Sequence, residues 1–307
     1  MRDSVKIIDY DSVIGKSDFL RNIQVWPLDD VLNYKGWLDN FPNSEEKAIA
    51  LQMLYFFIYY PKSMIKQMLK TVVGYCGEIL QSRFSNWQHD DFINRCIYSY
   101  IPGETINPTD SGHTFLKMLR DELHIPEDHI VNYKDVFSIK NTSNPIPVIF
   151  VDDFLGSGAQ CEKAWNKNKI GPFGKTLKKI AASSSHTFIY APLIANHIGY
   201  NRIKNNCNGL TLLPCHILNN EYNLFDPECI CWGKDNELYS KGTELILSKS
   251  KMLGIPFSDG KSVNDVRGFN KQGLALAFEN GAPDAILPIF YWCNDNWTPL
   301  IKKEYKR

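Results

Sequence analysis

The sequence predicts an α/β fold with a parallel-sheet core, helices on both faces of the sheet and an N-terminal helical extension. From about residue 96 onwards, short apolar runs alternate with helical patterns, and loops rich in Pro, Gly, Asp and Ser separate them. This order is typical of parallel strands that are joined by crossover helices. Residues 1–95 instead contain two successive helical patterns. We therefore expect a mainly helical extension at 1–95 and an α/β domain at 96–307.

The composition is that of a folded protein, and the balanced charges give it no strong net electrostatic field. Hydrophobic residues make up 44% of the 307 residues and charged residues 22%, which excludes a disordered chain. The 34 basic and 34 acidic side chains cancel, so net charge does not draw the chain to nucleic acid or membrane. The N-terminal segment lacks a signal-peptide pattern, and the most apolar stretch, 48–60, is too short to span a bilayer. We expect a cytoplasmic protein that does not associate with membranes.

Two helices are expected in the N-terminal extension. Asn43 or Ser44 can cap the first, and apolar residues follow at helical spacing through Tyr60. Pro61 should end this helix, because proline cannot donate the next backbone hydrogen bond. A second helix is expected from there to about residue 81.

The α/β domain is expected to contain strands and helices in alternation. Short β-branched apolar runs predict the strands, and longer segments with apolar residues every three or four positions predict the helices. The expected elements are strand 97–101, helix 114–123, strand 146–151, helix 159–168, strands 187–194 and 210–213, helix 272–278 and strand 285–291.

One stretch, VIFVDDFLGSGAQ, combines a buried-strand pattern with two acids and a glycine-containing turn. Ligands of parallel sheets bind beyond the carboxyl ends of the strands, which is where Asp152 and Asp153 are expected. The turn at 156–158 opens a helix, and its backbone N–H groups can converge on a phosphate. Carboxylates can accept hydrogen bonds from sugar hydroxyls or hold Mg²⁺. Together these groups predict a site for a ribose 5-phosphate.

This stretch resembles the signature of type I phosphoribosyltransferases. In that family, two acids at the end of an apolar strand engage the ribose hydroxyls of phosphoribosyl pyrophosphate, and the loop amides bind its 5-phosphate. The resemblance implies a catalytic, ribose-binding role for Asp152 and Asp153, which would also hold Mg²⁺ through the ligand or water. It implies a phosphate-binding role for Leu155, Gly156, Ser157, Gly158, Ala159 and Gln160.

The loop also departs from the family pattern. Ser157 is its only hydroxyl residue, and Gln160 stands where a threonine is usual. Gly156 stands where purine-salvage members often carry an acid that accepts a proton near the base.

Three longer segments resemble a narrower group. FPNSEEKAIALQMLYFFIYYPKSMI, VDDFLGSGAQ and GLALAFENGAPDAILPIFYWCNDNWTPL look like the divergent phosphoribosyltransferase-like effector domains (PRTase-CE type) of bacterial conflict systems such as retrons. This resemblance implies an antiphage effector, or toxin, that binds a phosphoribosyl or nucleotide ligand and works beside a reverse transcriptase with its RNA–DNA product. Two alternatives remain: a phosphoribosyltransferase or nucleotide-cleaving enzyme, and a non-catalytic nucleotide-sensing or scaffold module.

A second loop could contribute to the same site. Ser111, Gly112 and His113 precede the expected helix at 114–123, and by resemblance could form the pyrophosphate loop of the family. The alternative is a helix cap next to a partly exposed histidine.

Two further clusters have alternative interpretations. The lysines that follow the glycine turn could attract a polyphosphate or a nucleic-acid backbone, or could form a solvated surface; they are Lys163, Lys167, Lys169, Lys175, Lys178 and Lys179.

Another group has residue types that suit zinc: Cys207, Cys215, His216, Cys229 and Cys231. Its spacing does not match the paired Cys-x2-Cys pattern of structural zinc sites, so we expect buried free thiols.

Overall fold

The computed structural model describes residues 9–103, 111–137, 145–171 and 174–303. The chain forms two compact units, one made of Met1–Lys62 together with Asn219–Arg307 and the other of Ser63–Leu218. The boundary expected near residue 95 lies inside the second unit. This difference arises because the helical residues 63–95 belong to the same unit as the sheet, while the segment from residue 219 belongs to the unit of the N-terminal helices.

The second unit is built on a five-stranded parallel sheet with the order β2-β3-β6-β7, in which β8 also pairs with β6. Its strands are β2 (Ile97–Tyr100), β3 (Pro147–Leu155), β6 (Thr187–Asn196), β7 (Leu210–Leu212) and β8 (His216–Leu218). The predicted α/β class with a parallel sheet is confirmed.

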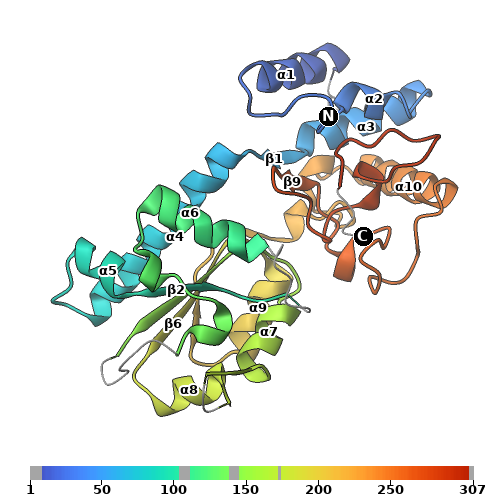
Figure 1. Cartoon of the computed structure of the whole chain (residues 1–307). Helices are drawn as coiled ribbons and strands as arrows, with labels where there is room; N and C mark the ends of the chain where they lie inside the picture. Colours follow the sequence, from blue (N-terminus) through green and yellow to red (C-terminus); the bar gives the residue numbers. More distant parts are fainter. Residues whose placement is uncertain (1–8, 104–110, 138–144, 172–173, 304–307) are drawn as a thin grey trace. The chain divides into compact units, whose positions relative to one another are not determined.

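Helices lie on both faces of this sheet, with α4 and α6 on one side and α7 and α8 on the other (Figure 1). The helices of the unit are α4 (Lys62–Arg83), α5 (His89–Arg95), α6 (Ser111–Leu123), α7 (Ala159–Asn166), α8 (Leu177–Ser183) and α9 (His197–Asn206). A short hairpin, β4 (Lys169–Ile170) and β5 (Lys175–Thr176), connects α7 to α8. The core beneath α7 contains the large buried rings of Phe150, Trp165 and Phe188.

Strand β3 is longer than expected. The apolar run predicts an end at Val151, but the strand pairs with β6 as far as Leu155, opposite Ala195. Asp152 and Asp153 therefore belong to the last part of the strand and do not follow it. The pairing with β6 maintains the extended conformation after the apolar run has ended.

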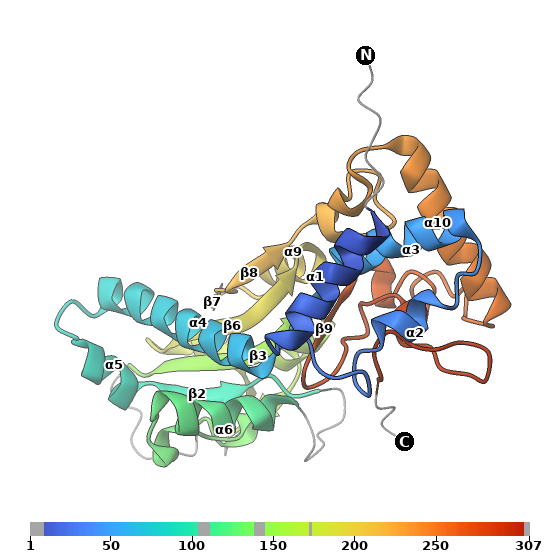
Figure 2. The same ribbon diagram turned by 90° about the horizontal axis from the view of Figure 1, so that it is seen from above.

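Most of the regular secondary structure of the first unit is helical. It contains α1 (Tyr10–Asn22), α2 (Tyr34–Leu38), α3 (Ser44–Phe56) and α10 (Asn236–Met252), with a small parallel pair of strands, β1 (Ile58–Tyr60) and β9 (Leu276–Phe278). Figure 2 shows α10 close to α3, and Lys249 Nζ donates to Glu46 Oε2 at 2.7 Å between these two helices. Asn43 caps α3 as predicted, accepting from the N–H groups of Glu45 and Glu46.

Three predicted element assignments in this unit are wrong. The chain at 58–60 is a strand and not the end of a helix, and residues 276–278 within the predicted helix 272–278 form its partner strand. The predicted strand at 285–291 contains instead a short 3-10 helix, Pro288–Phe290. The pairing of two segments that are distant in the sequence decided the first two conformations, and local apolar patterns do not report such pairing.

Within the described parts of the chain, no helix combines the length and apolar character needed to cross a bilayer.

Candidate active site

The candidate site lies at the carboxyl end of β3, where the two acids lead into the glycine turn. Gly158 has φ +75° and is the N-cap residue of α7, which begins at Ala159. Residues other than glycine are strained at this φ, so the turn depends on glycine here. The prediction that the turn opens a helix is confirmed.

Asp152 is half-buried as a whole residue, but its carboxylate is the enclosed part and already has hydrogen-bond partners. Its Oδ2 accepts a hydrogen bond from the hydroxyl of Tyr190 on β6 at 2.8 Å, and its Oδ1 accepts one from the N–H of Asp153 at 3.0 Å. Burial, and next the negative charge of Asp153, raise the pKa of Asp152 well above its ordinary value. This carboxyl group therefore resists ionisation.

Asp153 is also half-buried, and its Oδ1 accepts from the N–H of Phe154 at 2.9 Å. The two neighbouring acids thus interact with each other and with the backbone that leads into the turn. Such an acid pair can share a proton or bind a hydroxyl-rich ligand, and a cation held next to it would relieve the repulsion between its charges.

Helix α9 supports the back of the turn through Gly199 and Arg202. A Cβ atom at position 199 would overlap the carbonyl oxygen of Gly156. Arg202 Nη1 donates to the carbonyl oxygen of Ser157 at 3.0 Å, and Arg202 Nε lies 3.5 Å from Glu162 Oε2. The carbonyl groups of Gly156 and Ser157 therefore face α9.

This support orients the N–H groups of the turn. In a trans peptide the N–H points opposite to the preceding C=O, and the described residues contain no cis peptide. The N–H group of Ser157 consequently points away from Gly199, and the N–H group of Gly158 points away from the guanidinium group of Arg202. Sequence reasoning missed Gly199 and Arg202, because nothing in the local pattern HIGYNR shows which loop this helix contacts.

A cavity of about 740 Å³ lies at the carboxyl end of the neighbouring strand β2. Tyr100, at the end of β2, pairs with Val151 immediately before the acids, so the cavity lies at the same edge of the sheet. The cavity is lined by Tyr100, Pro102, His113, Asn132, Tyr133, Lys134 and Asp135. The sequence did not indicate the last four residues, because they belong to a segment without a recognisable motif.

The predicted pyrophosphate-loop residues form the first turn of α6, because this helix begins at Ser111 and not at Thr114. A Cβ atom at Gly112 would overlap the ring of Tyr100, so glycine permits this close approach. His113 is half-buried, and its Nε2 lies 3.3 Å from the hydroxyl of Tyr100. The side chain of Ser111 and residues 104–110 lie outside what the structure describes.

Among the described residues, no group of three or more His, Cys, Asp or Glu side chains could hold a metal ion. The expectation of buried free thiols is met by Cys207, Cys229 and Cys231, whereas Cys215 is half-buried and His216 is exposed. Asp152 and Asp153 supply two carboxylates. Mg²⁺ is commonly held by one or two carboxylates when phosphate oxygens and water complete its shell, so the acid pair fits Mg²⁺ only together with a phosphate ligand.

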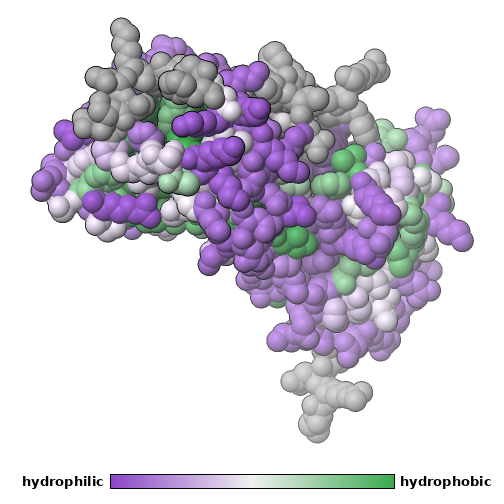
Figure 3. Space-filling model, turned by 90° about the horizontal axis from the view of Figure 1, so that it is seen from below, coloured by the Kyte–Doolittle hydropathy of each residue, from purple (hydrophilic) through white to green (hydrophobic). Residues whose placement is uncertain are grey.

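The six lysines that follow the turn are all exposed. They lie on α7, directly after its end, on the β4–β5 hairpin and on α8. Within the described part of the chain none of them forms an ion pair, and the nearby Glu162 pairs with Arg202. The surface seen from below in Figure 3 is largely hydrophilic.

No curated protein matches the chain. A family model, PRTase-CE, matches residues 34–303, which include both the helical front and the acid–glycine stretch. The chain therefore belongs to the PRTase-CE family and contains a phosphoribosyltransferase-like domain.

Proposed function

We propose that this protein binds a phosphorylated ribose compound, either phosphoribosyl pyrophosphate or a nucleotide, at the carboxyl end of β3. The observation that carries the proposal is the turn at 156–158. The carbonyl groups of Gly156 and Ser157 contact Gly199 and Arg202 of α9, so the N–H groups of Ser157 and Gly158 point away from these two contacts. Oriented backbone N–H groups at the start of a helix form a favourable phosphate site. Asp152 and Asp153, which precede the turn, would accept hydrogen bonds from the ribose hydroxyls.

Mg²⁺ would enter this site with its ligand. Asp152 and Asp153 would hold the ion directly or through water, and it would neutralise charge on a pyrophosphate group. The cavity beside Tyr100 and His113 has room for the part of the ligand beyond the ribose.

In its catalytic form, the protein would make or break a bond at the anomeric carbon of the ribose. Charge develops on the sugar and on the departing pyrophosphate or base, and the acid pair and turn would position and stabilise these groups. Membership of the PRTase-CE family and the resemblance to effector domains support a role as the toxin of a retron-type antiphage system.

The hydrogen bonds of Asp152 favour a second function. In this function the protein is a non-catalytic module that senses a nucleotide or docks on a reverse transcriptase with its RNA–DNA product. Both oxygens of the Asp152 carboxylate already accept a hydrogen bond, one from Tyr190 and one from the backbone, so fewer lone pairs remain to act on a substrate. The exposed lysines on α7, the hairpin and α8 offer a surface for a nucleic-acid backbone.

Calorimetric titration with phosphoribosyl pyrophosphate, ribose 5-phosphate and AMP, with and without Mg²⁺, tests the first function. Replacing both acids, Asp152→Asn with Asp153→Asn, should abolish binding of each ribose compound. The exposed neighbouring pair Asp29 and Asp30 provides the matched control, and its double Asn variant should bind normally. Full affinity in the first double variant would remove the site assignment. Binding without release of pyrophosphate or base would favour the sensor.

The lysine surface makes a separate prediction for the second function. Replacing Lys178 and Lys179 by Glu should weaken binding of an RNA–DNA hybrid. It should also lower the slope of log K against log salt by about one for each phosphate group that the two lysines neutralise. Fluorescence anisotropy over a series of salt concentrations measures both quantities. An unchanged slope would show that these lysines do not bind the nucleic-acid backbone.

A further inference from the structure

One exposed face of α10 carries an apolar side chain between an acidic and a basic one. Ser240, Glu244, Leu247 and Lys251 follow each other at spacings of four, three and four residues, which places them on one face. All four are exposed. The opposite face of the helix is buried in the unit through Gly242, Leu245, Ile246 and Ser250.

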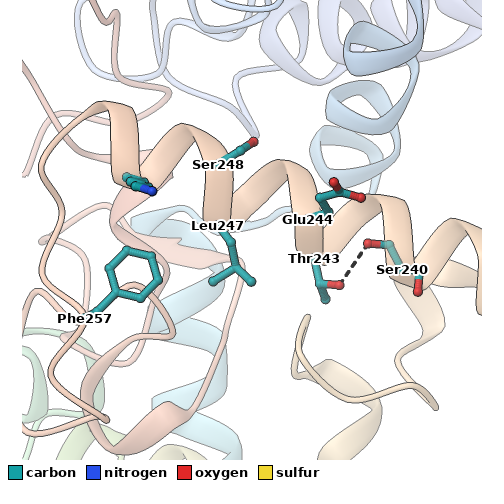
Figure 4. Close-up of a pocket in the computed structure, with 7 residues that line it drawn as sticks. Ser240, Thr243, Glu244, Leu247, Ser248 and Phe257 are labelled. Carbon is teal, nitrogen blue, oxygen red and sulfur yellow. Dashed lines mark hydrogen bonds between the residues drawn. The ribbon is translucent and has the colours of Figure 1, made fainter.

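This face borders a shallow groove of about 520 Å³. In Figure 4 the ring of Phe257, from the segment after α10, lies beside the helix near Leu247. Phe257 is 59% exposed and Leu247 36%, so two large apolar side chains of the groove lining face water. Covering these two side chains with a partner would be favourable, because it removes apolar surface from water.

The charged side chains that line the groove differ from other charged side chains of α10 in having no ion-pair partner among the described residues. Lys241 pairs with Glu45 and Glu237, and Lys249 pairs with Glu46. Glu244 and Lys251 form no ion pair within the described residues, although both line the groove. They lie seven residues apart, two helical turns, on either side of Leu247 and Ser248.

We propose that this face of α10 is an interface between two copies of this chain, in which the two α10 helices pack antiparallel about a two-fold axis. An axis between Leu247 and Ser248 brings Glu244 of each copy opposite Lys251 of the other. It brings Leu247 of the two copies together at the centre. The face is thus complementary to itself, which is what a two-fold interface requires.

The placement of these two charges favours a second copy of the chain, and not an unrelated protein, as the partner that binds this face. The acid and the base are equally distant from one centre and have opposite signs, so pairing with itself satisfies both charges at once. The patch is small, so the dimer should be concentration-dependent and should weaken as salt screens the two ion pairs. This inference does not rest on the proposed ligand or reaction.

Sedimentation velocity of the full chain tests the proposal. At low salt the mass should rise with protein concentration from 35.3 kDa towards twice that value. Glu244→Lys and Lys251→Glu should each weaken dimerisation about ten-fold or more, because each places two pairs of like charges opposite each other. The double variant with both changes should restore the dimer.

Matched controls separate this interface from a general effect of charge. Asp30→Lys and Lys302→Glu make the same changes at exposed positions of the same unit and should leave dimerisation unchanged. A chain that stays monomeric at all concentrations overturns the proposal. So does a dimer that survives the single reversals, or one that the double variant fails to restore.

Cross-linking tests the antiparallel arrangement. In a Cys293→Ser background, which removes the exposed native thiol, Leu247→Cys should form a disulfide between chains in oxidised glutathione. Ser240→Cys should not, because the two copies of this position lie about 22 Å apart along an antiparallel pair. The reverse result would overturn the two-fold centre.

Discussion

Gly199→Ala should weaken binding of ribose 5-phosphate by roughly 5- to 150-fold. The new methyl group would overlap the carbonyl oxygen of Gly156, so either the turn or the start of α9 must move. Overpacking of this kind costs about 1–3 kcal/mol, and a shift of the turn removes N–H groups from their common target. Calorimetric titration measures the affinity, and circular dichroism checks that the variant is folded.

The chain contains a matched control for this substitution. Gly74 also lies inside a helix, but a Cβ atom there meets nothing within 4 Å. Gly74→Ala should leave binding unchanged and should stabilise the protein by about 0.5–1 kcal/mol, because alanine is the better helix former. If Gly199→Ala keeps full affinity in a folded protein, α9 does not support the phosphate turn.

Asp152→Asn should make the metal-free protein more stable at neutral pH, even though it removes a candidate ligand-binding group. The folded protein must bury this carboxyl group next to Asp153, and both effects raise the pKa of Asp152. Asparagine has a similar shape and no charge, and the hydroxyl of Tyr190 can turn to accept from its amide. We expect the free energy of unfolding to rise by about 1 kcal/mol or more, which should raise the Tm.

The sign of the pH dependence follows from the direction of the pKa shift. Because the folded pKa of Asp152 lies above the unfolded value of about 4, the stability that this group contributes is fully present below pH ~4 and is lost as pH rises towards the folded pKa. The advantage of asparagine should therefore be absent at low pH and grow as pH increases. Thermal unfolding of both proteins in EDTA across this range measures the difference. A constant difference at all pH values, or an identical one in the exposed control Asp30→Asn, would contradict the explanation.

Local chemistry made the acid–glycine stretch recognisable. An apolar β-branched run predicts a buried strand, and the turn at Gly158 requires a conformation that glycine adopts without strain. The cap of α3 at Asn43 is local in the same way, because it depends on residues within one helical turn.

Two of the failures of prediction share one cause. The apolar patterns at Ile58–Tyr60 and Leu276–Phe278 predict helices, and each segment becomes a strand only because the other lies beside it. Their apolar side chains suit a helix or a strand, and a partner more than two hundred residues away decides between them.

The sequence by itself determined the parallel α/β class, the strand with its acid pair and the turn that opens α7, because neighbouring residues specify each of these. Only the tertiary structure decided that Gly199 and Arg202 orient this turn, that Tyr190 and burial change the acidity of Asp152, and that the C-terminal segment joins the N-terminal helices. These features depend on contacts between segments distant in the chain. Backbone preferences and apolar periodicity act over a few residues and do not specify which distant segments will pack together.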